Sequence, residues 1–165
     1  MIATHPRSSI TVQYGAPGDD LPARALLRRW ARAALGASAA NTTIVLRFVD
    51  EVESRTLNRR HRGRDRPTNV LSFVYDDEHG APGGDIVLCA PVLRREAVEQ
   101  GKSLAAHCAH LVVHGVLHLQ GYDHERAADA GKMEARERAI LAGLGFGNPY
   151  ATPVAPAARS ARARR

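Results

Sequence analysis

The alternation of apolar and polar residues predicts short strands, mainly in the first half of the chain. Ile10, Val12 and Tyr14 alternate with polar residues, which is the pattern of a half-buried strand. Other short apolar runs are bounded by residues that favour turns or helix starts. Together these patterns predict four strands, over residues 10–14, 43–49, 70–75 and 85–89.

Apolar residues at helical spacing, together with capping residues, predict five helices. Asp50 and Glu53 form a capping arrangement, Pro91 suits a first helical residue, and Ser103 can cap the helix that follows it. Gly121 is well placed to end that last helix, which is the most apolar of the chain. The predicted helices cover residues 21–35, 50–60, 91–100, 104–119 and 126–143.

The order of these elements predicts an α+β domain, in which a small mixed four-stranded sheet is packed with about five helices around the central helix 104–119. Residues 1–150 should form this single domain, because a chain of 165 residues fits one hydrophobic core. Residues 151–165 are rich in Ala, Pro and Arg without apolar periodicity, and we expect them to be a disordered tail.

The composition indicates an ordinary folded protein of the cytoplasm. The chain is 44% hydrophobic and 24% charged, it has no apolar run of about 18 residues, and its first residues lack a signal-peptide pattern. We therefore expect a cytoplasmic protein with no membrane partner. Cys89 and Cys108 belong to no C-x-x-C motif, so we expect buried thiols rather than a disulfide scaffold or a thiolate zinc site.

Positive charge is concentrated in two segments. Arginines in the last seven residues supply four of the six net positive charges, so the rest of the chain is only mildly basic. The densest run within the domain comprises Arg55, Arg59, Arg60, Arg62, Arg64 and Arg66. Guanidinium groups offer forked donors to phosphate, so this cluster favours a phosphodiester partner. A solvated basic face is the alternative for most of these arginines taken singly.

Three histidines have the spacing of a metal site. His114 and His118 are four residues apart on the predicted helix 104–119, so their imidazoles project from one face, one turn or ~5.4 Å apart. After Gly121 the chain can turn and bring His124 to that face. Three imidazoles suit one zinc ion per chain and leave a fourth position for water, as in catalytic zinc sites. Nickel or copper could bind the same nitrogens.

The histidines have two alternative interpretations. The histidines could be core or surface residues brought close by chance, and we expect structural roles for the neighbouring His107 and His110. A zinc peptidase is the second alternative, but its H-E-x-x-H signature needs a glutamate base directly after the first histidine. Gly115 occupies that position, so the sequence disfavours a peptidase.

These residues resemble the YbeY family of bacterial rRNA maturation factors, which are described as single-strand-specific metallo-endoribonucleases. Two stretches carry the resemblance: residues 55–73, R-T-L-N-R-R-H-R-G-R-D-R-P-T-N-V-L-S-F, and residues 114–124, H-G-V-L-H-L-Q-G-Y-D-H. The segments 84–86, G-D-I, and 133–134, M-E, also fit the family's pattern. The resemblance extends over residues 10–150 and implies a small mixed sheet with helices and a central cleft.

The resemblance also implies a site and a biological role. A zinc ion would bind His114, His118 and His124, and Arg62, just before G-x-D-x-P-T, would be the functional arginine. The family's role is maturation of 16S rRNA, particularly its 3′ end, and ribosome quality control, which implies single-stranded RNA and the small ribosomal subunit as partners. His61 stands where the family commonly has an aromatic residue.

Two hypotheses of function follow. In the first, the protein is a zinc-dependent endoribonuclease in which Arg62 binds the scissile phosphate. In the second, it is an rRNA-binding ribosome-assembly factor whose zinc is mainly structural. The sequence leaves open whether water or the RNA 2′-hydroxyl is the nucleophile, whether Asp85, Asp123 or His107 assist, and the oligomeric state.

Overall fold

A mixed four-stranded sheet forms the centre of the computed structural model, which describes residues 8–39, 41–75, 83–123 and 125–151. The strands lie in the order β1-β2-β4-β3; β1, β2 and β4 are parallel, and β3 pairs with β4 in the antiparallel sense. Their bounds are Ser9–Tyr14 (β1), Thr43–Val49 (β2), Val70–Val74 (β3) and Gly83–Cys89 (β4). The predicted mixed four-stranded sheet is confirmed.

Five α-helices within the described residues accompany the sheet, which confirms the predicted α+β class. They are α1 (Arg24–Leu35), α2 (Glu51–Arg62), α3 (Ala90–Glu99), α4 (Leu104–Leu119) and α5 (Ala127–Gly143), with a short 3-10 helix at Gly36–Ala39. None of the described helices is long and apolar enough to cross a membrane. The turn expected near residue 79 and almost all of the expected tail fall on residues 76–82 and 152–165, outside the described residues.

Local signals in the sequence account for the helix ends. The Asp50 side chain accepts a hydrogen bond from the Glu53 amide (2.9 Å), and Ser103 caps α4 through the Ala106 amide (3.1 Å). Helix α2 continues to Arg62, beyond the predicted end near residue 60, because it stops only where Gly63 adopts a left-handed conformation (φ 68°). Arg62, which we expected in a loop, is therefore the last residue of a helix.

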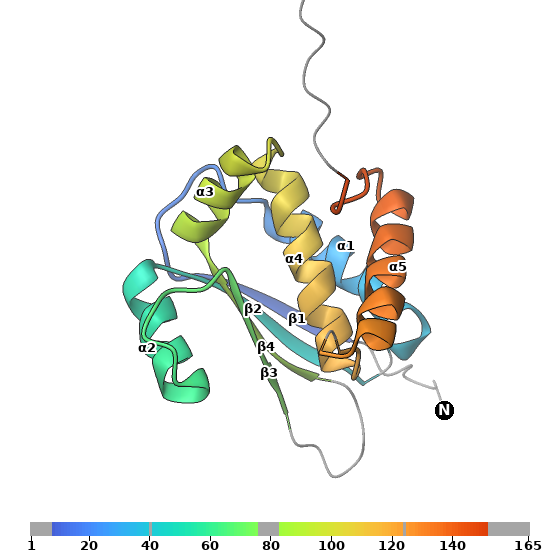
Figure 1. The fold of residues 1–165 in the computed structure, drawn as a ribbon, viewed down its shortest axis with the longest axis horizontal. Coiled ribbons are helices and arrows are strands. Elements are labelled where there is room, and N and C mark those ends of the chain that lie inside the picture. The colour runs from blue at the N-terminus through green and yellow to red at the C-terminus, as the bar shows by residue number, and fades with distance from the viewer. Residues whose placement is uncertain (1–7, 40, 76–82, 124, 152–165) are drawn as a thin grey trace, which may run out of the picture.

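The two faces of the sheet bury separate clusters of apolar side chains. Along β4, Ile86 and Leu88 belong to the main core, whereas Val87 and Cys89 face a smaller cluster that includes Leu57 of α2. Figure 1 accordingly shows α1, α4 and α5 on one side of the sheet and α2 on the other. Cys89 and Cys108 are both buried free thiols, as predicted.

Helix α4 lies at the centre of the main core and packs against α1, α3 and α5 (Figure 1). It approaches the sheet closely at Gly115, where an added Cβ would lie only 2.9 Å from Ile86 Cγ2. Because Gly115 carries no side chain, the α4 backbone can lie directly on β4. The packing of the buried α4 residues therefore fixes the orientation of the helix, and with it the direction in which the histidine side chains point.

Candidate metal centre

Four histidines form a row along one face of α4. The ring centroids of His107 and His110 are 6.4 Å apart, those of His110 and His114 are 6.2 Å apart, and those of His114 and His118 are 4.7 Å apart. The last two rings meet edge to face, at 81°. The helical spacing thus places the two imidazoles side by side, although their role as metal ligands stays a prediction.

The chain turns immediately after this row. Gly121 has a φ of 93°, and the Tyr122 amide donates to the Leu117 carbonyl (3.2 Å), which closes the end of α4. The helix therefore ends just before Gly121, as the sequence predicted. The third predicted ligand, His124, lies outside the described residues.

A buried carboxylate from α5 lies against the same row. Glu137 is 0% exposed, and its two oxygens contact His114 Nδ1 (2.7 Å) and His110 Nε2 (2.8 Å). The Tyr150 hydroxyl donates to the second of these oxygens at 2.5 Å. Burial by itself raises the pKa of Glu137, but the hydrogen bonds from His110, His114 and Tyr150 outweigh it and lower the pKa to about 2. Glu137 is therefore ionised at neutral pH.

The charge on Glu137 decides which histidine nitrogens carry protons. An ionised carboxylate only accepts hydrogen bonds, so His114 must donate from Nδ1 and His110 from Nε2. His114 then carries its lone pair on Nε2, the nitrogen that could bind a metal ion. This arrangement, in which a carboxylate accepts from the second nitrogen of a histidine ligand, is common at zinc sites.

His110, His114 and Glu137 also form a group whose ligand atoms lie within 4.8 Å of one another. Two ligands on one tetrahedral zinc ion, with bonds of about 2.0–2.1 Å, lie about 3.3 Å apart. The contacts of 2.7 and 2.8 Å to Glu137 are shorter than that and match hydrogen bonds. The donor chemistry therefore fits a metal ion on the histidine row, with Glu137 bound to a ligand rather than to the ion.

His107, the first histidine of the row, contacts Glu96 rather than Glu137. His107 is 2% exposed, and its Nε2 lies 3.5 Å from Glu96 Oε1 of α3, while Asn69 donates to the other Glu96 oxygen at 3.2 Å. Burial lowers the pKa of His107. These contacts tie α4 to α3 and to the start of β3, which agrees with the structural role expected for His107. His110, by contrast, joins Glu137 and His114.

Asp85 and Asp123 each have a partner of their own. The Tyr75 hydroxyl donates to Asp85, and this hydrogen bond raises the pKa of Tyr75 to about 12. Asp123 accepts from the Glu125 amide (3.1 Å) in the turn after α4.

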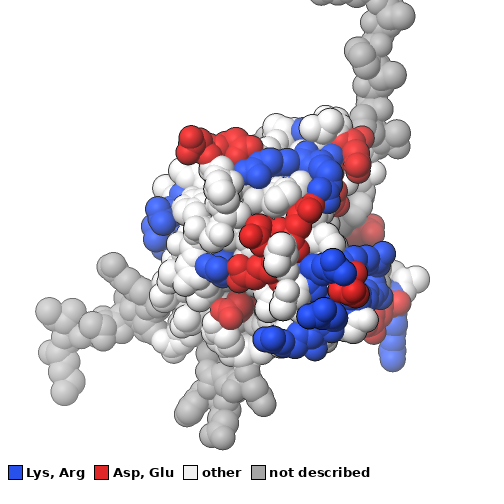
Figure 2. Space-filling model, turned by 90° about the vertical axis from the view of Figure 1, so that its left-hand side faces the viewer, with Lys and Arg blue, Asp and Glu red and all other residues white. Residues whose placement is uncertain are grey.

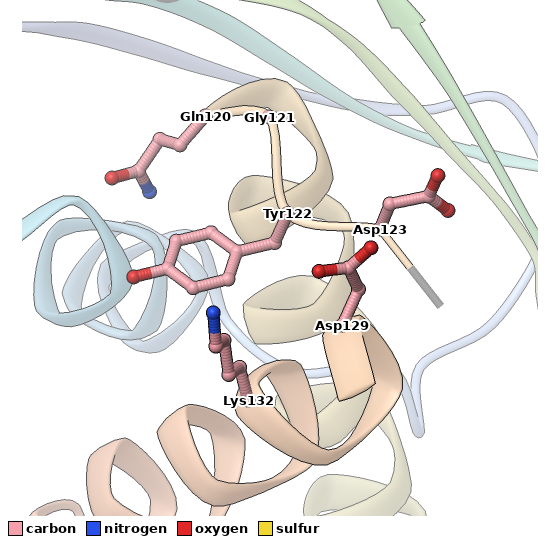
Figure 3. A pocket seen from close by; sticks show the side chains of 6 residues that line it. All are labelled: Gln120, Gly121, Tyr122, Asp123, Asp129 and Lys132. Atoms are coloured by element: carbon pink, nitrogen blue, oxygen red, sulfur yellow. The ribbon is translucent and has the colours of Figure 1, made fainter. Parts of the chain in front are cut away.

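A pocket of about 340 Å³ opens between the end of α4 and the start of α5. Figure 3 shows the Tyr122 and Asp123 side chains pointing in opposite directions from the turn, while Asp129 and Lys132 project from α5. Because two carboxylates and one lysine line it, the pocket lacks the cationic surface that a phosphate requires.

The cationic surface comes instead from α2 and the loop after it. Ser54 Oγ donates to the Thr68 carbonyl (2.9 Å), and the Asn58 side chain donates to the Arg66 carbonyl (2.8 Å). Both side chains are buried. Arg55 makes two hydrogen bonds with Asp65, at 2.8 and 2.9 Å. These contacts hold residues 63–68, here called the arginine loop, against α2.

Within the part of the chain that the structure describes, four of the six arginines of this cluster form no ion pair with a carboxylate. Arg55 and Arg59 contact Asp65, whereas no ion pair within the described ranges involves the remaining four: Arg60, Arg62, Arg64 and Arg66. All four are exposed. Figure 2, viewed from the side of α2, shows a group of basic side chains on this face, next to a patch of carboxylates. These four arginines can therefore bind an anion without breaking an ion pair to any of the described carboxylates.

The position of Gly115 bears on the peptidase alternative. Its missing Cβ would meet three atoms of Ile86, between 2.9 and 3.3 Å away. A glutamate at this position would have to enter the core between α4 and β4, where it could not reach a metal on the histidine face. Gly115 therefore disfavours a peptidase in two ways. The sequence lacks the glutamate base at this position, and the structure leaves no room for its side chain.

Glu137 and Tyr150 were missed in the sequence. The signal available was the position of Glu137 on α5, where Met133, Ile140 and Leu141 are buried on the same face. A charged residue in register with buried apolar residues needs a polar partner inside the protein. Tyr150 gave no such signal, because it follows the last helix and is 45% exposed.

Known proteins match this chain over most of its length. A family model described as Endoribonuclease YbeY matches residues 19–145. A protein named Endoribonuclease YbeY from Aromatoleum aromaticum is 53% identical over 148 residues, which cover 88% of this chain and 94% of that protein. One from Nitrosomonas europaea is 53% identical over 141 residues, covering 86% of this chain and 84% of that protein.

A third relative and a solved structure also match this chain. A protein of the same name from Azoarcus sp. is 52% identical over 156 residues; the match covers 88% of this chain but 61% of that longer protein. The solution structure of a Thermotoga maritima protein matches with a TM-score of 0.55 and 25% identity, over 82% of this chain and 91% of that one. The fold is thus shared with a known structure across most of the chain.

Proposed function

Because the chain belongs to the YbeY family of endoribonucleases, we propose that it cleaves RNA with one zinc ion held by His114, His118 and His124, and with Arg62 on the scissile phosphate. The observation that carries the proposal is the adjacent pair of imidazoles on α4, one of which is hydrogen-bonded to the buried Glu137.

The donor set supports zinc in particular. Neutral imidazoles are good zinc ligands, and a set of three leaves one position open, as catalytic sites require. A bound zinc ion supplies Lewis acidity and lowers the pKa of a coordinated water molecule to about 7. The protein's own contribution is to place the His114 and His118 imidazoles side by side on α4.

Arg62 has the properties of a phosphate ligand. It is exposed at the end of α2, has no ion pair within the described residues, and precedes the anchored arginine loop. A guanidinium can donate two hydrogen bonds to a phosphodiester and stabilise the negative charge that develops there during cleavage. The neighbouring Arg60, Arg64 and Arg66 would add further attraction for the RNA backbone.

The arrangement around the arginine loop supports single-stranded RNA as substrate. The exposed His61 ring lies against Phe73 of β3, with centroids 4.8 Å apart and an angle of 65° between the rings. An unpaired base can stack on such a ring, whereas the bases of a duplex are already stacked on one another. Because α2 and α4 cover opposite faces of the sheet, a strand that contacts both would pass around the β3 edge (Figure 1).

We further propose that the substrate is 16S rRNA on the small ribosomal subunit, cleaved near its 3′ end in the cytoplasm during maturation and quality control. This finer assignment is supported by the family's sequence pattern in residues 55–73 and 114–124. The test is cleavage of precursor 16S rRNA in purified small subunits, compared with an unrelated single strand and with a duplex of equal length.

The decisive experiment on the mechanism compares Arg62→Ala with Arg32→Ala, an exposed arginine on α1. Loss of one charge-stabilising donor commonly costs about 2.7–4 kcal/mol in the transition state, or about 100- to 1000-fold in rate. We therefore expect Arg62→Ala to cleave about 100- to 1000-fold more slowly in single turnover at saturating protein. Zinc content and melting temperature should stay at the level of the unmodified protein.

The Arg32→Ala control should cleave at the unmodified rate. If Arg62→Ala also does so, Arg62 has no catalytic role, and an rRNA-binding assembly factor with a structural zinc becomes the better proposal. The product ends identify the nucleophile, since a 2′,3′-cyclic phosphate indicates attack by the RNA 2′-hydroxyl. A 5′-phosphate with a free 3′-hydroxyl indicates attack by water.

A further inference from the structure

Glu137 is the most deeply buried charge of the site and has no place in the proposed chemistry. Its side chain is fully buried on α5, yet three polar groups from other parts of the chain converge on its carboxylate. Burying a carboxylate is costly unless charged or hydrogen-bonded partners compensate. An apolar residue of similar size would fill the same core position without that cost, so the carboxylate requires a reason beyond packing.

The distances identify which contact gives that reason. His114 Nδ1, 2.7 Å from Oε1, is the only nitrogen in the group that belongs to a predicted metal ligand. His110 Nε2 and the Tyr150 hydroxyl both contact the other oxygen, at 2.8 and 2.5 Å. Oε2 is thus held by two donors, while Oε1 is directed at His114. His110 and Tyr150 therefore fix the orientation of the carboxylate through Oε2, and the carboxylate contacts the predicted ligand His114 through Oε1.

We propose that Glu137 is a positioning residue of the metal centre, which holds His114 with Nε2 turned toward the ion and offsets part of the ion's positive charge. His110 and Tyr150 hold Glu137 in turn, so the segment after α5 is coupled to the metal ligands of α4. This inference rests on the proposed metal site. It adds Glu137 to that site as a residue that contacts His114 and not the ion.

Zinc affinity of the full-length protein tests this assignment without an activity assay. Glu137→Gln keeps the shape of the side chain but removes its charge and one acceptor. Loss of such a partner commonly weakens metal binding by about 10- to 100-fold. We expect that loss in competition titrations against a chelating dye. Glu134→Gln, an exposed substitution on the same helix, should bind zinc as the unmodified protein does.

Cobalt substitution separates positioning from direct ligation. If Glu137 acts through His114, the visible absorption spectrum of cobalt-loaded Glu137→Gln should retain the band positions and intensity of the unmodified protein. A spectrum that reports a lost ligand would show that Glu137 binds the ion itself and would overturn the proposal. Unchanged zinc affinity in Glu137→Gln would overturn it as well.

Two controls keep the outcomes distinct. If the unmodified protein binds no zinc, or binds it equally well after His114→Ala, the proposed metal site itself fails. If Glu137→Gln does not fold, the tautomer of His114 in the unmodified metal-free protein decides, measured by long-range proton–nitrogen NMR. A proton on Nδ1 supports the assignment, and a proton on Nε2 contradicts it.

Discussion

Gly115→Ala should destabilise the protein, although alanine is the better helix former. The new methyl group would lie 2.9 Å from Ile86 Cγ2, 3.1 Å from Cδ1 and 3.3 Å from Cγ1. Ile86 is 0% exposed and branched at Cβ, so it cannot rotate away without disturbing the core around it. Either α4 moves off β4 or Ile86 leaves its rotamer.

The size of the effect follows from two opposing terms. Overpacking a well-filled core by one methyl group typically costs about 1–3 kcal/mol. Replacing glycine by alanine inside a helix typically contributes about 0.5–1 kcal/mol in favour of folding. Because three contacts are too short, we expect the steric cost to dominate, with a net loss of about 1–2 kcal/mol. For a chain of this length that lowers the melting temperature by about 2–8 °C.

Thermal and urea unfolding of the metal-free protein measure this loss, with Gly131→Ala as the matched control. Gly131 is a helical glycine of α5, and an added Cβ there would meet nothing within 4 Å. It should therefore gain about 0.5–1 kcal/mol from helix propensity alone. The two glycine-to-alanine changes are chemically identical, so their opposite signs would isolate the contact with Ile86.

A double-mutant cycle makes the test specific to that contact. Ile86→Ala removes the three atoms that the new methyl group meets. In that background Gly115→Ala should no longer be destabilising and should behave like Gly131→Ala. The reasoning is refuted if Gly115→Ala stabilises the otherwise unmodified protein, or if it costs the same with and without the Ile86 side chain.

Three further predictions concern capping, pH and thiol reactivity. Asp50→Ala removes the hydrogen bond to the Glu53 amide and should cost about 1 kcal/mol in unfolding experiments, whereas an unchanged stability would mean that the cap contributes nothing. The pKa of Glu137 is about 2 in the folded protein, below its ordinary value of 4.5, so its contribution to stability is present above pH 4.5 and is lost as the pH falls toward 2. Urea midpoints of the metal-free protein should therefore fall less steeply over this range in Glu137→Gln; parallel curves would contradict the assignment. Burial raises the pKa of Cys89 and raises that of Cys108 to about 12, so a thiol reagent at pH 8 should label neither in the native protein and both after unfolding.

Local sequence signals were sufficient for most of the secondary structure and for the pairing of two histidines. Helix α4 has the bounds that its capping serine and apolar run predicted, and β2 has the bounds that its β-branched run predicted. His114 and His118 lie side by side because their spacing of four residues matches one helical turn, whatever surrounds the helix. The role of Arg62 stays a prediction from its motif, and its expected place in a loop was wrong, because it is the last residue of α2.

The error at Arg62 has a local cause that sequence alone resolves poorly. Helix ends depend on one or two residues, and here two more residues stayed helical before Gly63 ended the helix. The sequence did not predict which face of the sheet α2 and α4 each cover. The faces they cover depend on how β4 divides its side chains between two clusters, which no periodicity within α2 or α4 reveals.

By itself, the sequence determined the helices and strands, the histidine pair and the family, since each of these depends on backbone geometry or on residues close together in the chain. Only the tertiary structure decided that Glu137 contacts His114, 23 residues away in the sequence, and that Tyr150 donates a hydrogen bond to Glu137. It also decided that α4 packs directly on β4 at Gly115. Those contacts arise where separate elements pack together. Their energies depend on burial and distance in three dimensions, because a carboxylate acts on a histidine only when water is excluded and the donor lies within hydrogen-bond reach.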